Sequence, residues 1–480
     1  MAGAESERLL TSTQCEELLR RARGFARGGG TTTIEARSWW QGELRWGRNR
    51  VSLSSDRRDI AVRVIRRVEG GEPTIVETNQ IDDVSLESAV RAAERQSKLG
   101  ARPGVGFGFF PKLPAYEPYS KGHIWSDATY GLSTEERGET ARGMIEPAEA
   151  KGLVSAGYLE VRGATLARLG DDFPELRSAP HAHWHMPYTR WTHAHCSTTV
   201  RDATGTGSGW AGSSSYDWSA IDTTALADRA VEKCVASRNP VALEPGRYTV
   251  ILEPQAVADL LEVLLRKLHQ RESPESGQPG PWLLGRDEAL GLWRSKLGLK
   301  VVDERITLEH DPADPLLGIL MSLTEQPEPV RWIEGGILTN IGHYFDTDVR
   351  ALEGRYHLRG PTGYRMSGGS TTVDEMIATT RRGLLVTRFS NIRELDGVSL
   401  LSTGLTRDGL WLIENGKVSK AVKNFRFTES PLFMLNSIEQ LGEPVPVFRP
   451  ARAEGAAPTP AIVPPLKVRD FSFTSLIDAV

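Results

Sequence analysis

The sequence has few cysteines, no long hydrophobic run and no excess of basic charge. Its three cysteines, Cys15, Cys196 and Cys234, form an odd and widely spaced set among 480 residues. This set argues against a disulfide framework and predicts a reducing compartment. Lysine and arginine number 58 against 62 aspartates and glutamates, a net charge of −4. The chain therefore has no overall positive field with which to hold a nucleic-acid backbone.

Membrane and secretion signals are also missing. No apolar stretch approaches the roughly 20 residues that a membrane-spanning helix needs. The first ten residues carry Glu5 and Glu7 and contain no apolar segment typical of a secretory signal. We therefore expect a cytoplasmic protein with neither a membrane nor a nucleic acid as its partner.

Several well-known catalytic motifs are absent as well. The sequence contains no P-loop, no C-x-x-C pair, no G-x-S-x-G and no H-E-x-x-H helix. The glycine-rich stretch Gly205–Gly209, with Gly212, is followed by serine, tyrosine and tryptophan rather than by an amphipathic helix. It therefore predicts a hairpin or a bulge rather than a nucleotide loop. Spacing alone predicts no catalytic residue on this chain.

What the sequence does contain is the pattern of a globular protein with two domains. Hydrophobic residues make up 39% and charged residues 25%, and the length exceeds what one core usually supports. Asn239-Pro240 marks a boundary, so we expect an N-terminal α+β domain at 1–238 and a β-rich C-terminal domain at 239–480. The expected fold class is α+β, with the N-terminal helices on a mainly antiparallel sheet.

Local patterns predict the individual elements. Helical periodicity and capping residues predict helices at 7–26, 85–99, 132–151, 223–237 and 254–269. Alternating or β-branched runs predict strands at 31–40, 59–68, 157–168, 181–202, 213–218, 248–252 and 470–475. Asn415-Gly416 predicts a tight hairpin between two apolar strands.

Five of the ten histidines fall in one window, 181–195. On a strand, His181, His183 and His185 share one face, because side chains alternate with a period of two. Together with His195 they could hold zinc or another borderline metal. The alternative is a polar strand face without a metal. Cys196 follows His195 directly, so the two side chains point to opposite faces.

Longer segments resemble the TldD/PmbA (TldE) family of peptidases, collinearly over almost the whole chain. The matching segments are 59–65, the helix from Ser85, 245–257, 335–338, 346–365, 371–377, 382–386 and 404–417. The resemblance implies two α+β domains and dimeric assembly. It also implies that active TldD-type members are zinc metallopeptidases, with an H-E-x-x-x-H helix and a cysteine from the C-terminal domain.

Carried onto this sequence, the six motif positions fall on Glu262 to Lys267, and the zinc ligands are missing. Glu262 and Lys267 stand at the two histidine positions and Val263 at the glutamate position, and no cysteine follows Cys234. A lysine ammonium has no lone pair for a metal, and valine cannot act as a general base. This pattern resembles the TldE subunits, which lack the motif and pair with a TldD subunit.

The resulting hypothesis is a subunit without zinc of a TldD/TldE-type metallopeptidase. We expect a TldD-like zinc-bearing partner in a heterodimer, or a homodimer, with a peptide as substrate and the zinc on the partner subunit. This chain itself is expected to bind no cofactor. Two alternatives are a stand-alone metallohydrolase with a relocated site at His181, His183, His185 and His195, and a peptide-binding protein without catalysis.

Overall fold

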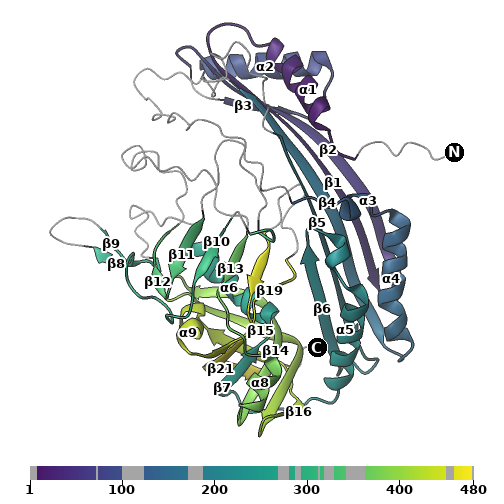
Figure 1. Ribbon diagram of the computed structural model, residues 1–480, viewed down its shortest axis with the longest axis vertical. Helices are drawn as coiled ribbons and strands as arrows, with labels where there is room; N and C mark the ends of the chain where they lie inside the picture. The colour runs from purple at the N-terminus through teal and green to yellow at the C-terminus, as the bar shows by residue number, and fades with distance from the viewer. Residues whose placement is uncertain are drawn as a thin grey trace.

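The computed structural model describes residues 8–71, 74–99, 124–170, 188–268, 280–286, 293–311, 314–317, 329–341, 363–449 and 459–477. Over these residues the chain folds as two successive parts, an α+β part followed by a strand-rich part (Figure 1). This architecture confirms the α+β class expected from the sequence. None of the described helices is long and apolar enough to cross a membrane.

One six-stranded antiparallel sheet forms the centre of the N-terminal part, with its strands in the order β3-β2-β1-β4-β5-β6. The strands are β1 Gly30–Gly47, β2 Arg50–Val68, β3 Thr74–Thr78, β4 Val154–Gly170, β5 Tyr188–Arg201 and β6 Ser208–Ser215. Arg48 and Asn49 join β1 to β2 with φ of 52° and 61°. Two successive left-handed residues form the tight turn whose twist matches that of the flanking strands.

Helices cover one face of this sheet, and the C-terminal part lies against the other face (Figure 1). The helices are α1 Ser12–Gly24, α2 Asp83–Leu99, α3 Asp127–Gly131, α4 Thr134–Glu149 and α5 Thr223–Ala236, with a short 3₁₀ turn at Trp218–Ala220. Ser133 begins α4 with a capping box, since its Oγ accepts from the N–H of Glu136 at 3.1 Å. The apolar stripes of these helices bury the core predicted from their periodicity.

A closed ring of strands forms the centre of the C-terminal part, because β14 pairs with both β7 and β15. The strands of this barrel and its extensions are β7 Gly246–Leu252, β14 Arg382–Asp396, β15 Leu401–Glu414, β16 Lys417–Ala421, β17 Phe425–Glu429, β18 Ile438–Leu441 and β21 Leu466–Leu476. Asn415 and Gly416, with φ of 51° and 77°, form the predicted hairpin between β15 and β16.

A second sheet and a buried helix complete this part. The sheet has the order β12-β11-β10-β13-β20-β19. Its strands are β10 Leu308–His310, β11 Val330–Glu334, β12 Ile337–Leu338, β13 Tyr364–Met366, β19 Val445–Pro446 and β20 Ala461–Val463, and a separate pair is β8 Leu283–Arg286 with β9 Trp293–Ser295. The helices are α6 Pro254–Leu268, α8 Val373–Ala378 and α9 Pro431–Asn436. Leu260, Leu261 and Leu264 of α6 are fully buried in the core.

The structure differs from the sequence-based expectation mainly in strand length. β1 and β2 continue through residues 41–58, which the sequence did not predict as strand because polar residues dominate there. β6 begins at Ser208 rather than at 213, and the glycine-rich stretch before it is the β5–β6 hairpin loop. Asp202 stabilises this loop by accepting from the N–H groups of Thr206 and Gly207, at 2.9 and 3.0 Å.

A buried aspartate joins the two parts of the chain. Ser208 Oγ of β6 donates to Asp408 Oδ1 of β15 at 2.7 Å, and Arg388 of β14 pairs with the other carboxylate oxygen. Lys233 of α5 adds a second bridge to Glu253 at 2.6 Å. Arg407 Nε also lies 3.7 Å from Asp408 Oδ2. Because Asp408 is fully buried, its charge is stabilised by protein groups such as these rather than by water.

We expect Asp408→Asn to lower the free energy of unfolding by about 2 kcal/mol, because it leaves the Arg388 guanidinium without its carboxylate. Asp408 has a φ of 56°, and asparagine tolerates this left-handed backbone, so the loss does not come from backbone strain. The control Ser208→Ala removes one neutral donor and should cost only about 1 kcal/mol. Urea unfolding measures both, and an Asp408→Asn protein as stable as the wild type would contradict this account of the junction.

Candidate functional site

A row of polar side chains crosses β4 and β5 on the face of the sheet opposite the helices. β4 contributes Tyr158, Glu160 and Arg162, and β5 contributes His193 and His195. These residues share a face because strand side chains alternate, and the register places Glu160 opposite His195 and Arg162 opposite His193. Glu160, Arg162, His193 and His195 are at most 4% exposed. The row is therefore a buried polar cluster, and we call these five residues the β4/β5 cluster.

Glu160 lies at the centre of the β4/β5 cluster. Its Oε2 accepts from Gln41 Nε2 at 2.7 Å and from the Tyr158 hydroxyl. Its Oε1 lies 3.5 Å from Arg162 Nε and 3.9 Å from His195 Nδ1, but it accepts no hydrogen bond from any residue that the structure describes. The carboxylate is thus anchored on one oxygen and open on the other.

Burial and the Arg162 charge set the protonation of the cluster. Desolvation lowers the pKa of His195 to about 3, and the nearby guanidinium of Arg162 lowers it further. The pKa of His193 is lowered well below its ordinary value, first by burial and then by the charges of Arg162 and His195. Burial raises the pKa of Glu160, against the attraction of Arg162. Both imidazoles are therefore neutral at pH 7.

The C-terminal part meets the β4/β5 cluster through the segment after β19. The Phe448 ring lies edge-on to His195 at 5.4 Å and to Trp210 at 5.8 Å between ring centroids. The next residue, Arg449, donates its backbone N–H to Ser214 Oγ of β6 at 3.0 Å. The cluster therefore lies at the junction of the two parts of the chain.

Arg449 also reaches α6, where the family resemblance places the first zinc ligand. Its Nη1 lies 2.5 Å from Glu262 Oε2. One turn earlier, half-buried Asp259 accepts from the N–H of Phe389 at 2.9 Å, and desolvation raises its pKa to about 6. This face of α6 is polar, but its groups pair with neighbouring side chains and backbone.

The residues at the zinc-motif positions do not fit a zinc ion. Glu262 is paired with Arg449, and Val263 is 1% exposed within the apolar core. Lys267 Nζ lies 3.3 Å from Glu394 Oε1 and contributes a positive charge instead of a lone pair. Of the three positions, only Glu262 has an oxygen donor, and a guanidinium occupies the space beside it. No step through a metal at this helix can be derived from these side chains.

The histidines predicted as an alternative metal site are only partly described. His181, His183 and His185 lie outside the described residues. His195 is buried beside His193, with ring centroids 5.9 Å apart, and Cys196 points to the opposite face into the helix-side core, as predicted. Among the described residues, no three His, Cys, Asp or Glu side chains gather as a metal site would require.

Sequence reasoning missed Tyr158, Glu160 and Arg162. The predicted strand 157–168 included all three, and their alternation with Leu159 and Val161 was the available signal. That alternation predicts a polar face but cannot tell a solvated face from a buried one. These side chains are buried by residues that are distant in the sequence, and the sequence of the strand itself does not reveal that packing.

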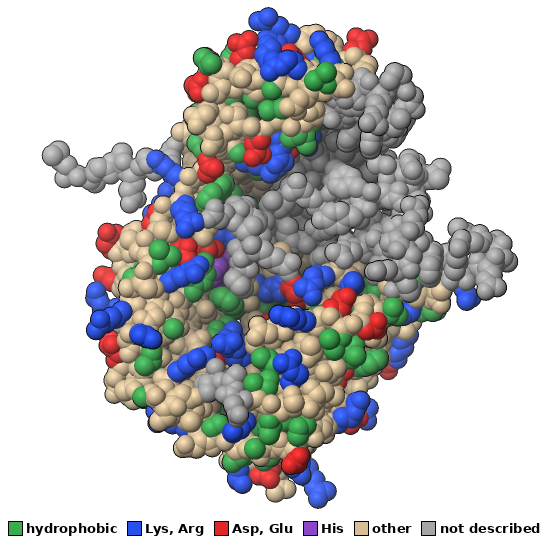
Figure 2. Space-filling view, turned by 180° about the vertical axis from the view of Figure 1, so that it is seen from behind, with side chains coloured by type: hydrophobic (Ala, Val, Ile, Leu, Met, Phe, Trp, Pro, Cys, Tyr) green, Lys and Arg blue, Asp and Glu red, His purple; other side chains and the backbone are tan. Residues whose placement is uncertain are grey.

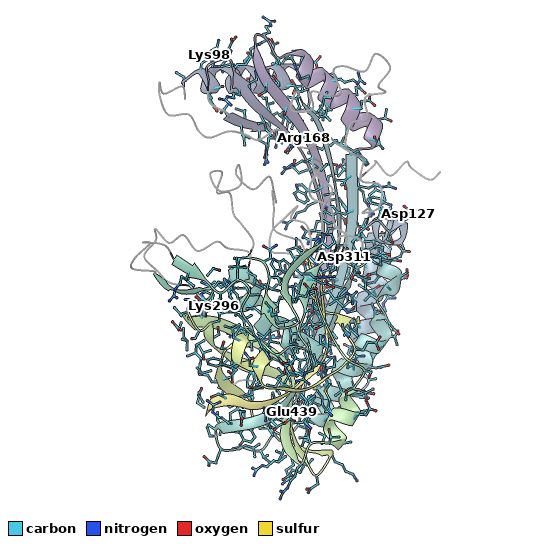
Figure 3. The ribbon with its side chains drawn as sticks, turned by 60° about the vertical axis from the view of Figure 1, so that its left-hand side comes forward. Lys98, Asp127, Arg168, Lys296, Asp311 and Glu439 are labelled. Atoms are coloured by element: carbon cyan, nitrogen blue, oxygen red, sulfur yellow. The ribbon has the colours of Figure 1, made fainter. Side chains whose placement is uncertain are left out.

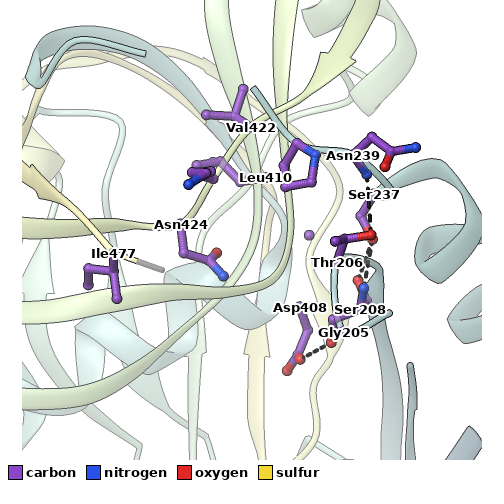
Figure 4. Close-up of a pocket in the computed structure, with 13 residues that line it drawn as sticks. Gly205, Thr206, Ser208, Ser237, Asn239, Asp408, Leu410, Val422, Asn424 and Ile477 are labelled. Carbon is purple, nitrogen blue, oxygen red and sulfur yellow. Dashed lines mark hydrogen bonds between the residues drawn. The ribbon is translucent and has the colours of Figure 1, made fainter. Parts of the chain in front are cut away.

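A second candidate is a cavity of about 310 Å³ at the same junction (Figure 4). Its lining comes from the β5–β6 loop, the predicted boundary at Asn239 and Pro240, and β15 with the residues after β16. Ser237 Oγ accepts from the N–H of Ser208 at 2.9 Å, and Ser208 binds Asp408. Since these polar groups are already hydrogen-bonded within the protein, they are less suited to bind a ligand than those of the β4/β5 cluster.

Comparison with known proteins agrees with this architecture. The family model described as the PmbA/TldA metallopeptidase C-terminal domain matches residues 245–475. TldE from Thermococcus kodakarensis is similar over 96% of this chain and 99% of its own, with 16% identity and a TM-score of 0.72. Identity this low shows a shared fold and nothing more. None of the curated proteins searched matches the sequence significantly.

Two further solved structures share the fold, and both are described as candidate modulators of DNA gyrase. The one from Thermotoga maritima is 15% identical, with a TM-score of 0.72, and covers 96% of this chain and 99% of its own. The one from Bacteroides thetaiotaomicron is 17% identical, with a TM-score of 0.71, and covers 97% and 100%. Both parts of the chain, over the residues that the structure describes, therefore share the architecture of these proteins.

The neutral histidines should make the protein sensitive to acid. The pKa of His195 is about 3 when folded and near its ordinary 6.5 when unfolded, so the unfolded chain binds the proton first. The stability from each neutral imidazole is fully present above pH 6.5 and declines as the pH falls, by up to about 1.4 kcal/mol per pH unit. Asp259, with a pKa raised to about 6, acts in the opposite sense between pH 3.8 and 6.

Comparison with the double variant His193→Asn/His195→Asn isolates the histidine effect from that of Asp259. We expect the free energy of unfolding of the wild type to fall more steeply than that of the variant between pH 7 and pH 5 in urea titrations. Parallel curves for the two proteins would show that the imidazoles are not held neutral in the fold.

Proposed function

Because the chain belongs to the TldD/PmbA family, we propose that it is the subunit without zinc of a TldD/TldE-type peptidase. It would pair with a zinc-bearing TldD-like subunit in the cytoplasm and help enclose a peptide for cleavage. The three described cysteines are free and buried, in keeping with a reducing compartment.

The observation that carries this proposal is the environment of α6. The helix begins directly after β7, as the family's motif helix does by resemblance, but its motif side chains pair with protein groups instead of a metal. Glu262 binds Arg449 and Lys267 binds Glu394, while Val263 packs in the core. Because the side chains of this helix pair with protein groups, its environment supports a role for this chain in the complex other than hydrolysis.

The charges on the surface also support a protein or peptide partner. Basic and acidic side chains both occur on the face seen in Figure 2, and the chain as a whole has a net charge of −4. This balance gives no overall positive field for a nucleic-acid backbone. Several buried polar atoms that have no hydrogen-bond partner among the described residues lie at the junction of the two parts, in the β4/β5 cluster.

Peptide binding without any catalytic partner is the second candidate function. The β4/β5 cluster favours it, because binding there needs no chemistry from another chain. The two candidates differ in one respect: only the first predicts that this chain changes the rate of a partner's cleavage reaction.

We expect this chain to form a heteromer with its TldD-like partner on a sizing column, and casein hydrolysis to appear only in the mixture. Zinc measured by elemental analysis should follow the amount of the partner. A partner whose H-E-x-x-x-H glutamate is changed to Gln should abolish hydrolysis without preventing assembly. Within this chain, Glu262→Gln should leave zinc content and activity of the mixture unchanged.

Two results would contradict the proposal. One is the failure of the two chains to associate. The other is stoichiometric zinc and hydrolysis by this chain alone, which would direct attention to His181, His183, His185 and His195.

A further inference from the structure

Arg162 is a buried cation that has no hydrogen-bond partner in the part of the chain that the structure describes. It is 2% exposed, yet no acceptor among the described residues binds its Nε, Nη1 or Nη2. Its nearest carboxylate oxygen is Glu160 Oε1, 3.5 Å from Nε, beyond the range of a good charged hydrogen bond. Buried charged groups are almost always paired, so an open guanidinium requires an explanation.

The groups around Arg162 are open in the same way. Within the described ranges, Glu160 Oε1 accepts no hydrogen bond, and neither His193 Nδ1 nor either ring nitrogen of His195 has a hydrogen-bond partner. Trp191 of β5 lies beneath the guanidinium, with its ring centroid 5.7 Å from Cζ, and holds the cation by its π face. The N–H donors of Arg162 are therefore surrounded by the Glu160 carboxylate oxygen and the neutral imidazoles of His193 and His195.

We propose that Arg162 anchors a carboxylate-binding subsite for peptides, in which the guanidinium binds the carboxylate and Glu160 and His195 face the adjoining peptide N–H groups. The carboxylate is either the C-terminus of the peptide or an Asp or Glu side chain. The inference rests on the proposed function only for the identity of the ligand as a peptide.

The chemistry favours a carboxylate over other anions. A guanidinium presents two parallel N–H donors that match the two oxygens of a planar carboxylate. A phosphate dianion would bring a second negative charge toward Glu160, and the neighbouring imidazoles are neutral and cannot compensate it. The acceptors beside Arg162 suit the amide N–H groups that accompany a carboxylate in a peptide.

A purely structural role is the competing explanation, in which Arg162 only balances Glu160. It accounts for one contact at 3.5 Å and leaves Nη1 and Nη2 without any acceptor. It also predicts that removal of the guanidinium destabilises the fold. The subsite predicts no such loss, because removing an open buried cation removes its desolvation cost, and Glu160, whose pKa burial raises, can bind a proton when the guanidinium is gone.

The test uses the full chain with Arg162→Met, and with Arg168→Met as the matched control. Arg168 lies on the same strand and the same face, in the upper part of the sheet away from Asp311 of the C-terminal part (Figure 3). The probes are three fluorescein-labelled octapeptides of alanine and serine. One has a free C-terminal carboxylate, one a C-terminal amide, and one the amide with a single internal glutamate.

In fluorescence anisotropy, the wild type should bind at least one carboxylate peptide about tenfold more tightly than the plain amide. Preference for the first peptide identifies the C-terminus, and preference for the third identifies an acidic side chain. Arg162→Met should abolish the preference and leave the melting temperature unchanged or higher, whereas Arg168→Met should retain the preference. Arg162→Lys, which keeps the charge without the paired donors, should show an intermediate preference.

Equal binding of all three peptides by the wild type would overturn the subsite, as would a preference that survives in Arg162→Met. A lower melting temperature of Arg162→Met with an unchanged preference would assign Arg162 to the structural role. Assembly with the TldD-like partner is measured separately on the sizing column, so either proposal can fail while the other stands.

Discussion

The alternation of side chains along the six antiparallel strands determines where every other feature of the N-terminal part lies. One face supplies the apolar surface on which α1, α2, α4 and α5 pack, and the other carries charged and polar residues toward the C-terminal part. Sequence neighbours such as His195 and Cys196 therefore lie on opposite faces, His195 in the β4/β5 cluster and Cys196 in the core beneath the helices. A shift of one residue in register would exchange the two faces, so the core and the candidate site depend on the same pairing.

Features with a local signal could be predicted from the sequence. The capping box at Ser133, the hairpin at Asn415-Gly416 and the amphipathic helices each depend on a few adjacent residues. The candidate site could not be predicted in the same way. Glu160 and His195 are opposite neighbours only through the β4–β5 register, and the Phe448 ring that packs on His195 comes from the other end of the chain. The full length of β1 and β2 escaped prediction for a related reason, since their polar stretch is held in strand by its neighbours.

The motif positions on α6 show how a chain accommodates residues that cannot bind zinc. A partly buried carboxylate at 262 needs a cation, and Arg449 provides one from the segment that also contacts β6. An ammonium at 267 needs an anion, and Glu394 provides it. Val263 needs only apolar neighbours and has them. Each of the three side chains at the motif positions thus has its own partner within the protein. The helix is therefore a structural element and not a metal centre that lacks one ligand.

At the junction, α6 and the β4/β5 cluster therefore differ in whether their polar groups are paired, and the fold alone does not require this difference. The charged groups of Glu262 and Lys267 on α6 pair with other side chains of the protein. On β4 and β5, the Arg162 guanidinium, one Glu160 oxygen, His193 Nδ1 and both His195 ring nitrogens are buried and have no hydrogen-bond partner among the residues that the structure describes. Burying such groups costs free energy that a methionine or leucine at the same positions would not cost. A cost of this kind is tolerated when the open groups act on a molecule that the folded chain does not itself contain. The unpaired groups of the β4/β5 cluster thus mark where a ligand binds. The paired charges of α6 show that the chain can satisfy buried charges where no ligand is needed.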